Sequence, residues 1–268
     1  MRADQLLVEH GLAASRAQAQ RLIGAGVQWR AHAGAAWQRV AKNGEVLPLQ
    51  AELQLLDAAE AEYVSRGGLK LAGALAASGV SVAGRLCLDV GQSTGGFTDC
   101  LLRHGAARVV GVDVGHGQLH PALRANPQVA CIERVNARSL VAADLAPVLD
   151  GAPARFGLIV GDLSFISLTL VLPALVPLLA PDGELLLLVK PQFELQPAQI
   201  GKGGLVKDPA LHAEVEQRIR AACTALGLRL RGWFDSPIAG GDGNREFFVH
   251  ATTTTNDEGG DHASSHQP

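Results

Sequence analysis

The fold is decided by the stretch Leu86-Cys87-Leu88-Asp89-Val90-Gly91-Gln92-Ser93-Thr94-Gly95-Gly96-Phe97, in which a short apolar run leads into a glycine-rich turn. Residues 97–104, which follow the turn, have the pattern of a helix. In a doubly wound sheet a ligand lies beyond the carboxyl ends of the strands, and glycines let the backbone approach it closely. The stretch therefore predicts a strand, a ligand-binding turn and a helix in an α/β domain.

The rest of the chain after about residue 65 continues this pattern, because apolar strands alternate with helical segments. The unbroken apolar run over residues 185–189 suits a strand that is buried on both faces. Strands are predicted at residues 86–90, 108–113, 130–135, 157–161, 184–189, 228–234 and 247–252. We therefore predict the α/β class, with a Rossmann-like, doubly wound and mostly parallel sheet of seven strands over residues 67–251.

Residues 1–60 are predicted to form a small α+β domain, joined to the larger one by a linker over residues 61–66. Its first helix is amphipathic and has Asp4 as the expected cap. A second helix is predicted over residues 16–23, where Ser15 and Gln18 form a capping-box pattern and Gly24 and Gly26 end the helix. Short strands are expected at residues 26–30, 36–41 and 53–56.

This order of two helices and three strands resembles the small S4-like RNA-binding domain. The strand half departs from the valine- and asparagine-rich hairpin of that family, because it carries Trp29, His32 and Trp37. A small helical cap with incidental surface arginines is the alternative. The candidate RNA-binding residues are Arg2, Arg16, Gln20 and Arg21 in this domain, and Arg66, Lys202 and Lys207 beyond it.

The net charge of −3 does not by itself indicate a nucleic-acid-binding protein, because phosphate binding needs clustered Lys and Arg. Three acidic residues and no Lys or Arg fall in residues 252–268, so the rest of the chain is neutral. This last stretch is polar and rich in Gly, Thr and Ser, and we expect it to be disordered.

Several classes of protein are disfavoured by the composition. The four cysteines form no C-x-x-C pair and the histidines show no metal spacing, so we expect no metal. Asp4 and Glu9 interrupt the region where a signal peptide needs an apolar stretch. The longest apolar run, residues 168–180, is shorter than the ~20 residues that span a bilayer. A cytoplasmic protein without a membrane partner is expected.

The glycine-rich turn differs from the common nucleotide sites. It lacks the Gly-Lys-Ser/Thr ending of a triphosphate site, and Ser93 stands where a dinucleotide fingerprint has its second glycine. Asp89 would repel a pyrophosphate but attract the ammonium of an amino-acid cofactor. Asp113, at the end of the second strand, can accept both hydroxyls of an adenosine ribose.

S-adenosylmethionine joins an amino-acid end to an adenosine and is therefore the predicted cofactor, whereas an NAD site or a degenerate turn is the alternative. Asn136 and Ala137, after the third strand, are placed to border the adenine. The candidate cofactor-binding residues are Asp89, Gly91, Ser93, Thr94, Gly95, Gly96, Phe97, Asp113, Asn136 and Ala137.

Two charged residues end neighbouring strands beside this turn. Lys190 follows the buried fifth strand and precedes Pro191, and Asp162 ends the fourth. Methyl transfer to a ribose hydroxyl needs a group that takes up a poorly acidic proton, and a lysine can serve. After Asp162 the chain reads Leu163-Ser164-Phe165, without the Pro-Pro-aromatic pattern of exocyclic-amine methyltransferases or the cysteine of pyrimidine-carbon enzymes. The sequence therefore disfavours methylation of an exocyclic amine and methylation of a pyrimidine carbon.

Six motifs resemble the TlyA family, in which an S4-like domain is joined to an FtsJ-like (RrmJ-like) 2′-O-methyltransferase domain of the class I, Rossmann-like type. They are Ser65-Arg66-Gly67-Gly68-Leu69-Lys70-Leu71, Asp89 to Asp99, Val112-Asp113-Val114-Gly115, Asp162-Leu163-Ser164-Phe165-Ile166-Ser167, Val189-Lys190-Pro191-Gln192-Phe193-Glu194 and Asn244-Arg245-Glu246-Phe247. The resemblance implies methylation of a ribose 2′-hydroxyl, of a cytidine in ribosomal RNA, with ribosomal RNA or its subunits as partner.

The family's catalytic set falls on Lys70, Asp162, Lys190 and Glu246. The resemblance implies that Lys190 deprotonates the hydroxyl, that Asp162 and Lys70 orient it, and that Glu246 holds Lys190. The glycine-rich segment over residues 199–207 suits a mobile loop that grips RNA phosphates, although an ordinary connector fits equally. Two rival functions stay open at this point: a haemolysin, a name that members of this family have carried, and a non-catalytic RNA-binding assembly factor.

Overall fold

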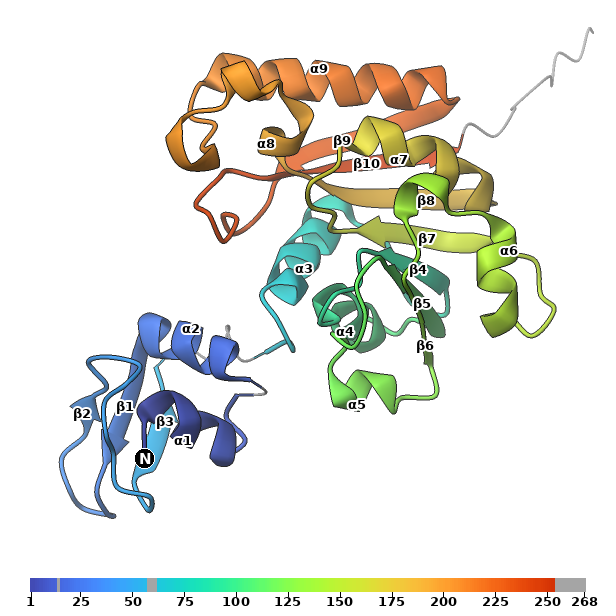
Figure 1. Cartoon of the computed structure of the whole chain (residues 1–268). Coiled ribbons are helices and arrows are strands. Elements are labelled where there is room, and N and C mark those ends of the chain that lie inside the picture. The colour runs from blue at the N-terminus through green and yellow to red at the C-terminus, as the bar shows by residue number, and fades with distance from the viewer. Residues whose placement is uncertain (14, 57–61, 254–268) are drawn as a thin grey trace, which may run out of the picture.

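The computed structural model describes residues 1–13, 15–56 and 62–253 of the chain. Figure 1 shows a small N-terminal unit of helices and short strands, followed by a larger unit in which helices cover one long sheet. The predicted α/β class is confirmed by this architecture. Residue 61 of the predicted linker and residues 254–268 of the predicted tail lie outside the described residues.

The N-terminal unit contains α1 (Ala3–Glu9), α2 (Arg16–Gly26), β1 (Val27–Arg30), β2 (Gln38–Arg39) and β3 (Glu52–Leu55). Its strands form an antiparallel sheet in the order β2-β1-β3. Leu6, Leu22 and Val27 are fully buried in a core that the two helices share with the sheet. The apolar stripe of each short helix is thus buried against its neighbours, which is where most helical stability in proteins originates.

Three predictions for this unit are wrong in detail. Asp4 does not cap α1, because Arg2 occupies the N-cap position and Asp4 lies inside the helix with a buried carboxylate. Gly24 does not end α2, because the chain leaves the helix only at Gly26, whose φ of 137° is left-handed. The strand expected over residues 36–41 is reduced to β2.

The larger unit is built on a seven-stranded sheet in the order β6-β5-β4-β7-β8-β10-β9. Strands from β6 to β8 pair in parallel, and β10 is antiparallel to both of its neighbours. These strands are β4 (Leu86–Val90), β5 (Arg108–Asp113), β6 (Val129–Glu133), β7 (Phe156–Gly161), β8 (Leu179–Val189), β9 (Leu228–Asp235) and β10 (Phe247–Thr253). The predicted mostly parallel sheet is therefore confirmed.

The helices of the larger unit are α3 (Gly67–Ser78), α4 (Gly96–Arg103), α5 (Pro121–Arg124), α6 (Ala142–Leu145), α7 (Leu168–Leu175), α8 (Pro191–Glu194) and α9 (Pro209–Ala225). Short 3-10 turns include η2 (Ala137–Ser139) and η6 (Lys202–Gly204). Figure 1 shows α7 and α9 on one face of the sheet and α3 and α4 on the other.

β8 explains why its sequence is apolar without alternation. Leu185, Leu187 and Val189 face the core that contains residues of α7 and α9. Leu186 and Leu188 face the core that contains residues of α3 and α4. A strand with both faces covered needs apolar side chains at every position, so the predicted double burial is confirmed.

Several strand ends differ from prediction, and those of β6, β8 and β10 are examples: β6 is Val129–Glu133 instead of residues 130–135. β8 begins already at Leu179, ahead of the predicted residue 184. β10 continues to Thr253, and Thr252 and Thr253 pair with Arg229 and Leu228. The first two residues of the predicted tail therefore belong to the sheet, because β9 supplies backbone partners for them.

Candidate active site

The turn after β4 needs its glycines for close approach. Gly91 has a φ of 83°, and a Cβ there would lie 2.6 Å from the carbonyl oxygen of Asp162 at the end of β7. Gly95 has a φ of 95° and occupies the N-cap of α4. A Cβ on Gly96 would overlap the hydroxyl of Ser65, which precedes α3. The turn is therefore held tightly between the end of β7 and the segment before α3.

Three carboxylates lie around this turn. Asp89 is fully buried, and one of its oxygens accepts a 2.6 Å hydrogen bond from the hydroxyl of Thr98. Its other oxygen has no hydrogen-bond partner within the part of the chain that the structure describes. Burial, helped by the charges of Asp162 and Asp113 and opposed by the hydrogen bond from Thr98, raises the pKa of Asp89 to about 7. A cationic group near the turn would relieve this accumulation of acids.

Asp113 is fixed at the end of β5 by backbone donors. Its carboxylate oxygens accept hydrogen bonds from the backbone nitrogens of Ser93 and Gly115, each at 2.7 Å. Each carboxylate oxygen has two acceptor sites, so each can still accept a hydroxyl. Asp113 is therefore oriented for a pair of neighbouring hydroxyls.

Two cavities meet at the turn. The first has a volume of about 460 Å³, and the predicted cofactor residues along it are Gly91, Ser93, Asp113, Asn136 and Ala137. The second, of about 200 Å³, is lined by Gly91, Ser93, Thr94, Gly96, Phe97 and Lys190 among others. Gly91, Ser93, Asp162 and Ser164 line both. A ligand in the first cavity can therefore reach the second beside Asp162.

Two of the predicted cofactor residues line neither cavity. Asp89 lies buried beneath the turn, so that any direct contact with a ligand requires the buried oxygen described above. Gly95 faces inward, where a Cβ would collide with the side chains of Leu119 and Leu123. Both residues stay predicted cofactor-binding residues, although neither lines a cavity.

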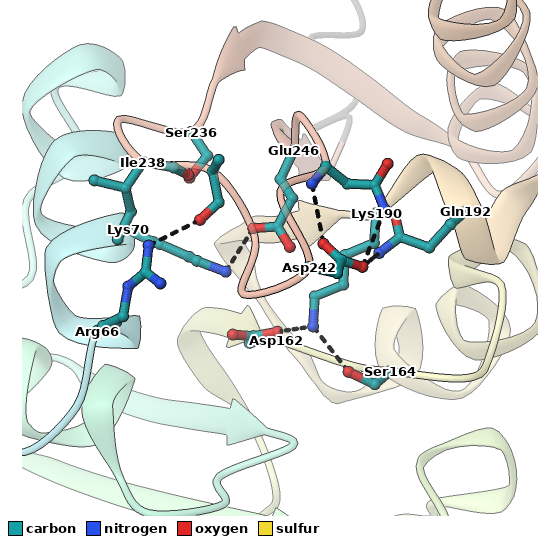
Figure 2. A network of polar contacts seen from close by, with 12 residues as sticks. Arg66, Lys70, Asp162, Ser164, Lys190, Gln192, Ser236, Ile238, Asp242 and Glu246 are labelled. Carbon is teal, nitrogen blue, oxygen red and sulfur yellow. Dashed lines mark hydrogen bonds and ion pairs between the residues drawn. The ribbon is translucent and has the colours of Figure 1, made fainter. Parts of the chain in front are cut away.

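The four predicted catalytic residues converge from four segments of the chain, as Figure 2 shows. Lys190 follows β8, and its ammonium lies 2.5 Å from the carboxylate of Asp162 and 2.9 Å from the hydroxyl of Ser164. Lys70 in α3 lies 2.5 Å from the carboxylate of Glu246, the residue before β10. The cluster thus consists of two ion pairs rather than one shared group.

The predicted partner of Glu246 is wrong. The sequence motifs implied that Glu246 holds Lys190, whereas its carboxylate pairs with Lys70 and Asp162 pairs with Lys190. The reason is that α3 brings Lys70 to the buried side of Glu246, while β7 and β8 are direct neighbours. Burial raises the pKa of Glu246, and the charges of Lys70 and Lys190 offset this only in part.

The predicted RNA-binding residues fall into two groups. In the N-terminal unit, Arg2, Arg16 and Gln20 all donate to the buried carboxylate of Asp4 at 3.0 to 3.1 Å. Arg2 and Arg16 remain about half exposed despite this contact. Arg21, also in α2, is partly buried.

In the larger unit, Arg66 caps α3 and donates to the backbone oxygen of Ala239 at 3.1 Å. Lys202 and Lys207 are exposed. Lys202 opens η6 in the glycine-rich segment that follows α8. These residues therefore lie on the same unit as the two ion pairs.

Sequence reasoning missed two residues at the site. Ser164 was not among the predicted catalytic residues, yet its hydroxyl accepts a hydrogen bond from Lys190 and it lines both cavities. Phe165 is 90% exposed at the mouth of the first cavity, with a left-handed φ of 65°. Its ring centroid lies 5.1 Å from that of Phe193. The signal was present, because Ser164 and Phe165 lie two and three residues after Asp162 in the same motif.

Over residues 1–13, 15–56 and 62–253, no helix is long and apolar enough to cross a bilayer. The same residues contain no group of three His, Cys, Asp or Glu side chains arranged to hold a metal ion.

Comparison with known proteins gives a consistent set of similarities. The family model of FtsJ-like methyltransferases matches residues 63–253. The 16S/23S rRNA (cytidine-2′-O)-methyltransferase TlyA of Mycobacterium tuberculosis is 44% identical over 95% of this chain and 90% of its own length. Hemolysin A of Brachyspira hyodysenteriae is 36% identical over 93% of this chain and 99% of its own. A solved structure of a hemolysin-named protein from Streptococcus thermophilus is 40% identical, with a TM-score of 0.72 over 95% of this chain and 88% of that chain.

Proposed function

The chain belongs to the FtsJ-like methyltransferase family, and on this premise we propose that it methylates the 2′-hydroxyl of a ribose in ribosomal RNA with S-adenosylmethionine as donor. The names of its relatives favour a cytidine as the target. The observation that carries the proposal is the ion pair of Lys190 and Asp162, because it stands where the two cavities meet. Such a protein acts where ribosomes are, which agrees with the cytoplasmic location expected from the sequence.

The residues of the turn suit S-adenosylmethionine in shape and charge. Asp113 would accept the ribose hydroxyls, and Asn136 and Ala137 would border the adenine in the first cavity. The three carboxylates around the turn favour a ligand that carries an ammonium and a sulfonium. When bound, S-adenosylmethionine would supply an electrophilic methyl group. The buried, unpartnered oxygen of Asp89 supports a cationic ligand rather than a pyrophosphate.

Lys190 is the proposed general base. Its ammonium position is fixed by Asp162 and Ser164, so its nitrogen is held within reach of a hydroxyl that enters the second cavity. To act as the base, Lys190 would first release its ammonium proton to solvent and would then take up the hydroxyl proton on its neutral nitrogen. The hydroxyl oxygen would form the new bond to the methyl carbon as the bond between that carbon and the sulfonium sulfur breaks. Positioning of this kind, together with base catalysis, accelerates a transfer more than either alone. Lys70 and Glu246 line neither cavity, and as a buried ion pair they would hold the surrounding segments in position.

Phe165 is proposed to hold the target base. A nucleotide must leave its stack before its ribose can enter a narrow cavity. An exposed aromatic ring at the cavity mouth offers a stacking surface that compensates for the lost base stacking. The N-terminal unit, with Arg2, Arg16 and Arg21, is proposed to dock on structured ribosomal RNA as an S4-like domain.

The direct test is transfer of radiolabel from S-adenosylmethionine to purified ribosomal subunits, followed by digestion to nucleosides. We expect label on the ribose of one or a few cytidines. Label on a base, or no transfer to either subunit, would contradict the proposal. Absence of transfer with retained RNA binding would instead favour the non-catalytic assembly factor.

The hemolysin name of one relative supports membrane activity as a second candidate. That name describes the protein of Brachyspira hyodysenteriae, so membrane activity of this chain has to be measured directly. Dye leakage from liposomes with the pure full chain separates the candidates, because a methyltransferase is expected to leave the liposomes intact. Leakage at stoichiometric protein would favour the second candidate.

A further inference from the structure

Asn244 lies at the centre of a hydrogen-bond network beside the active site. Its side chain is 1% exposed and donates from Nδ2 to the carboxylate of Asp242 at 3.0 Å and to the backbone oxygen of Gly204 at 2.9 Å. Its Oδ1 accepts from the backbone nitrogen of Val206 at 2.8 Å. A buried amide that satisfies both donors and its acceptor specifies one arrangement of its neighbours.

The network joins three segments that are far apart in the sequence. Gly204 and Val206 belong to the glycine-rich loop that carries Lys202, and Asn244 is two residues before Glu246. Asp242 also accepts a 2.9 Å bond from Gln192, which is two residues after Lys190. Figure 2 shows Asp242 between Gln192 and the catalytic residues.

The carboxylate of Asp242 is held in its charged form by this arrangement. Partial burial opposes ionisation, but the hydrogen bonds from Asn244 and the charge of Lys190 leave the pKa of Asp242 below its ordinary value. Gly240 also packs against this group, because a Cβ there would lie 2.6 Å from Oε1 of Glu246 and 2.8 Å from Oδ1 of Asp242. The backbone at Gly240 therefore lies close against the carboxylates of both Asp242 and Glu246.

We propose that Asn244 is a positioning residue that ties the Lys202 loop to both ion pairs, so that RNA contact at the loop sets the geometry of Lys190 and Glu246. This proposal rests on the proposed methylation of RNA. Asn244 lines neither cavity, and it acts through Asp242 and the backbone of the loop rather than on the substrate.

The test is a double-mutant cycle in the full chain with ribosomal subunits as substrate. Lys202→Ala should lower kcat/KM several-fold in the wild-type background by weakening the contact with RNA. Asn244→Ala should lower kcat by about tenfold or more. In the Asn244→Ala background, Lys202→Ala should have almost no further effect on kcat/KM. Independent effects that multiply would overturn the proposal.

An isosteric variant separates positioning from space filling. Asn244→Asp keeps the shape and the bond from Val206, but it removes both donated bonds and places a carboxylate against Asp242. Positioning predicts that this variant is as impaired as Asn244→Ala, whereas near-normal activity would overturn the proposal. Affinity for S-adenosylmethionine, measured by calorimetry, should stay within about twofold for both variants because neither cavity changes.

Two further variants complete the experiment. Asn126→Ala is the matched control, because Asn126 also bonds a nearby backbone nitrogen but lies in the turn before β6; it should retain full activity. Gln192→Ala removes the hydrogen bond from Gln192 to Asp242. It tests the proposal without a change at Asn244, and therefore serves if the Asn244 variants do not fold. It should lower kcat and remove the effect of Lys202→Ala, and unchanged coupling would overturn the proposal. Lack of transfer by the wild-type chain, in contrast, would contradict the proposed function itself.

Discussion

At the scale of single residues, the two ion pairs of the site have different surroundings and hence different roles. Lys190 and Asp162 border a cavity, with Asp162 24% exposed, so they can meet a substrate. Glu246 is 3% exposed and, like Lys70, lies behind the cavities. Lys190 and Asp162 can therefore contact a substrate. Lys70 and Glu246 line neither cavity, so they can act only by holding neighbouring residues in place.

Lys190→Ala is expected to lower kcat by about 10²- to 10⁴-fold, the usual contribution of a general base. Affinity for S-adenosylmethionine, measured by calorimetry, should change little because the turn is untouched. Lys42→Ala, at an exposed position in the N-terminal unit, is a control for loss of one positive charge. An active Lys190→Ala enzyme would remove Lys190 from the role of base.

Glu246→Gln is expected to destabilise the protein by about 3 kcal/mol, because it leaves Lys70 buried without its carboxylate. Thermal unfolding measures the loss. The double variant Lys70→Met/Glu246→Gln should recover much of the stability, since replacing both members of a buried pair is often neutral. It should stay impaired in transfer. A single variant with unchanged stability would show that the pair is not a buried support.

At the scale of elements, β4, its turn and α4 form one rigid unit that α3 and β7 enclose. The segment before α3 contributes Ser65 to the second cavity, and the end of β7 packs its backbone against Gly91. The proposed cofactor site is therefore built from backbone that has no room for additional side-chain atoms, and glycine is required for steric reasons.

Gly96→Ala is expected to weaken cofactor binding by about tenfold or more, since the new Cβ would overlap Ser65 and lie 2.9 Å from the backbone nitrogen of Gly68. Titration calorimetry measures the effect. Gly24→Ala is the matched control, because Gly24 is helical with nothing within 4 Å of its Cβ position. That variant should bind cofactor normally and gain about 0.5–1 kcal/mol of stability. Normal binding by Gly96→Ala would argue against the cofactor site.

At the scale of the whole molecule, the carboxylates of three different strand ends combine into one acidic centre. Asp89 is the last residue but one of β4, Asp113 ends β5 and Asp162 follows β7, and these strands are neighbours in the sheet. Burial is the main cause of the raised pKa of Asp89, and the charges of Asp162 and Asp113 act in the same direction.

The pH dependence of stability and binding should follow from Asp89. Its pKa of about 7 in the folded chain is above the unfolded value, so its contribution to stability is complete below about pH 4 and is lost as the pH rises through 7. A cationic cofactor favours the ionised carboxylate, so affinity for S-adenosylmethionine should rise between about pH 6 and pH 8. Calorimetry across this range is the measurement. Asp89→Asn should flatten both profiles, and an unchanged slope would refute the assignment.

The sequence by itself determined the fold class, the strands and the positions of the charged residues. Strands such as β4 and β5 were predicted to the residue, because apolar periodicity and glycine placement are local properties of a chain. The same local patterns predicted that Asp162 and Lys190 lie at the ends of neighbouring strands. The helix stop at Gly24 failed because glycine permits a left-handed backbone without requiring it.

Only the tertiary structure decided which charged groups meet. Lys70 and Glu246 are separated by 176 positions in the chain, and they pair because β10 is inserted between β8 and β9. Asp4 became the buried acceptor for Arg2 and Arg16, not a helix cap, because packing of α1 against α2 brought their side chains together. Hydrogen bonds and ion pairs of this kind act over a few ångströms, so they depend on distances that no local pattern contains.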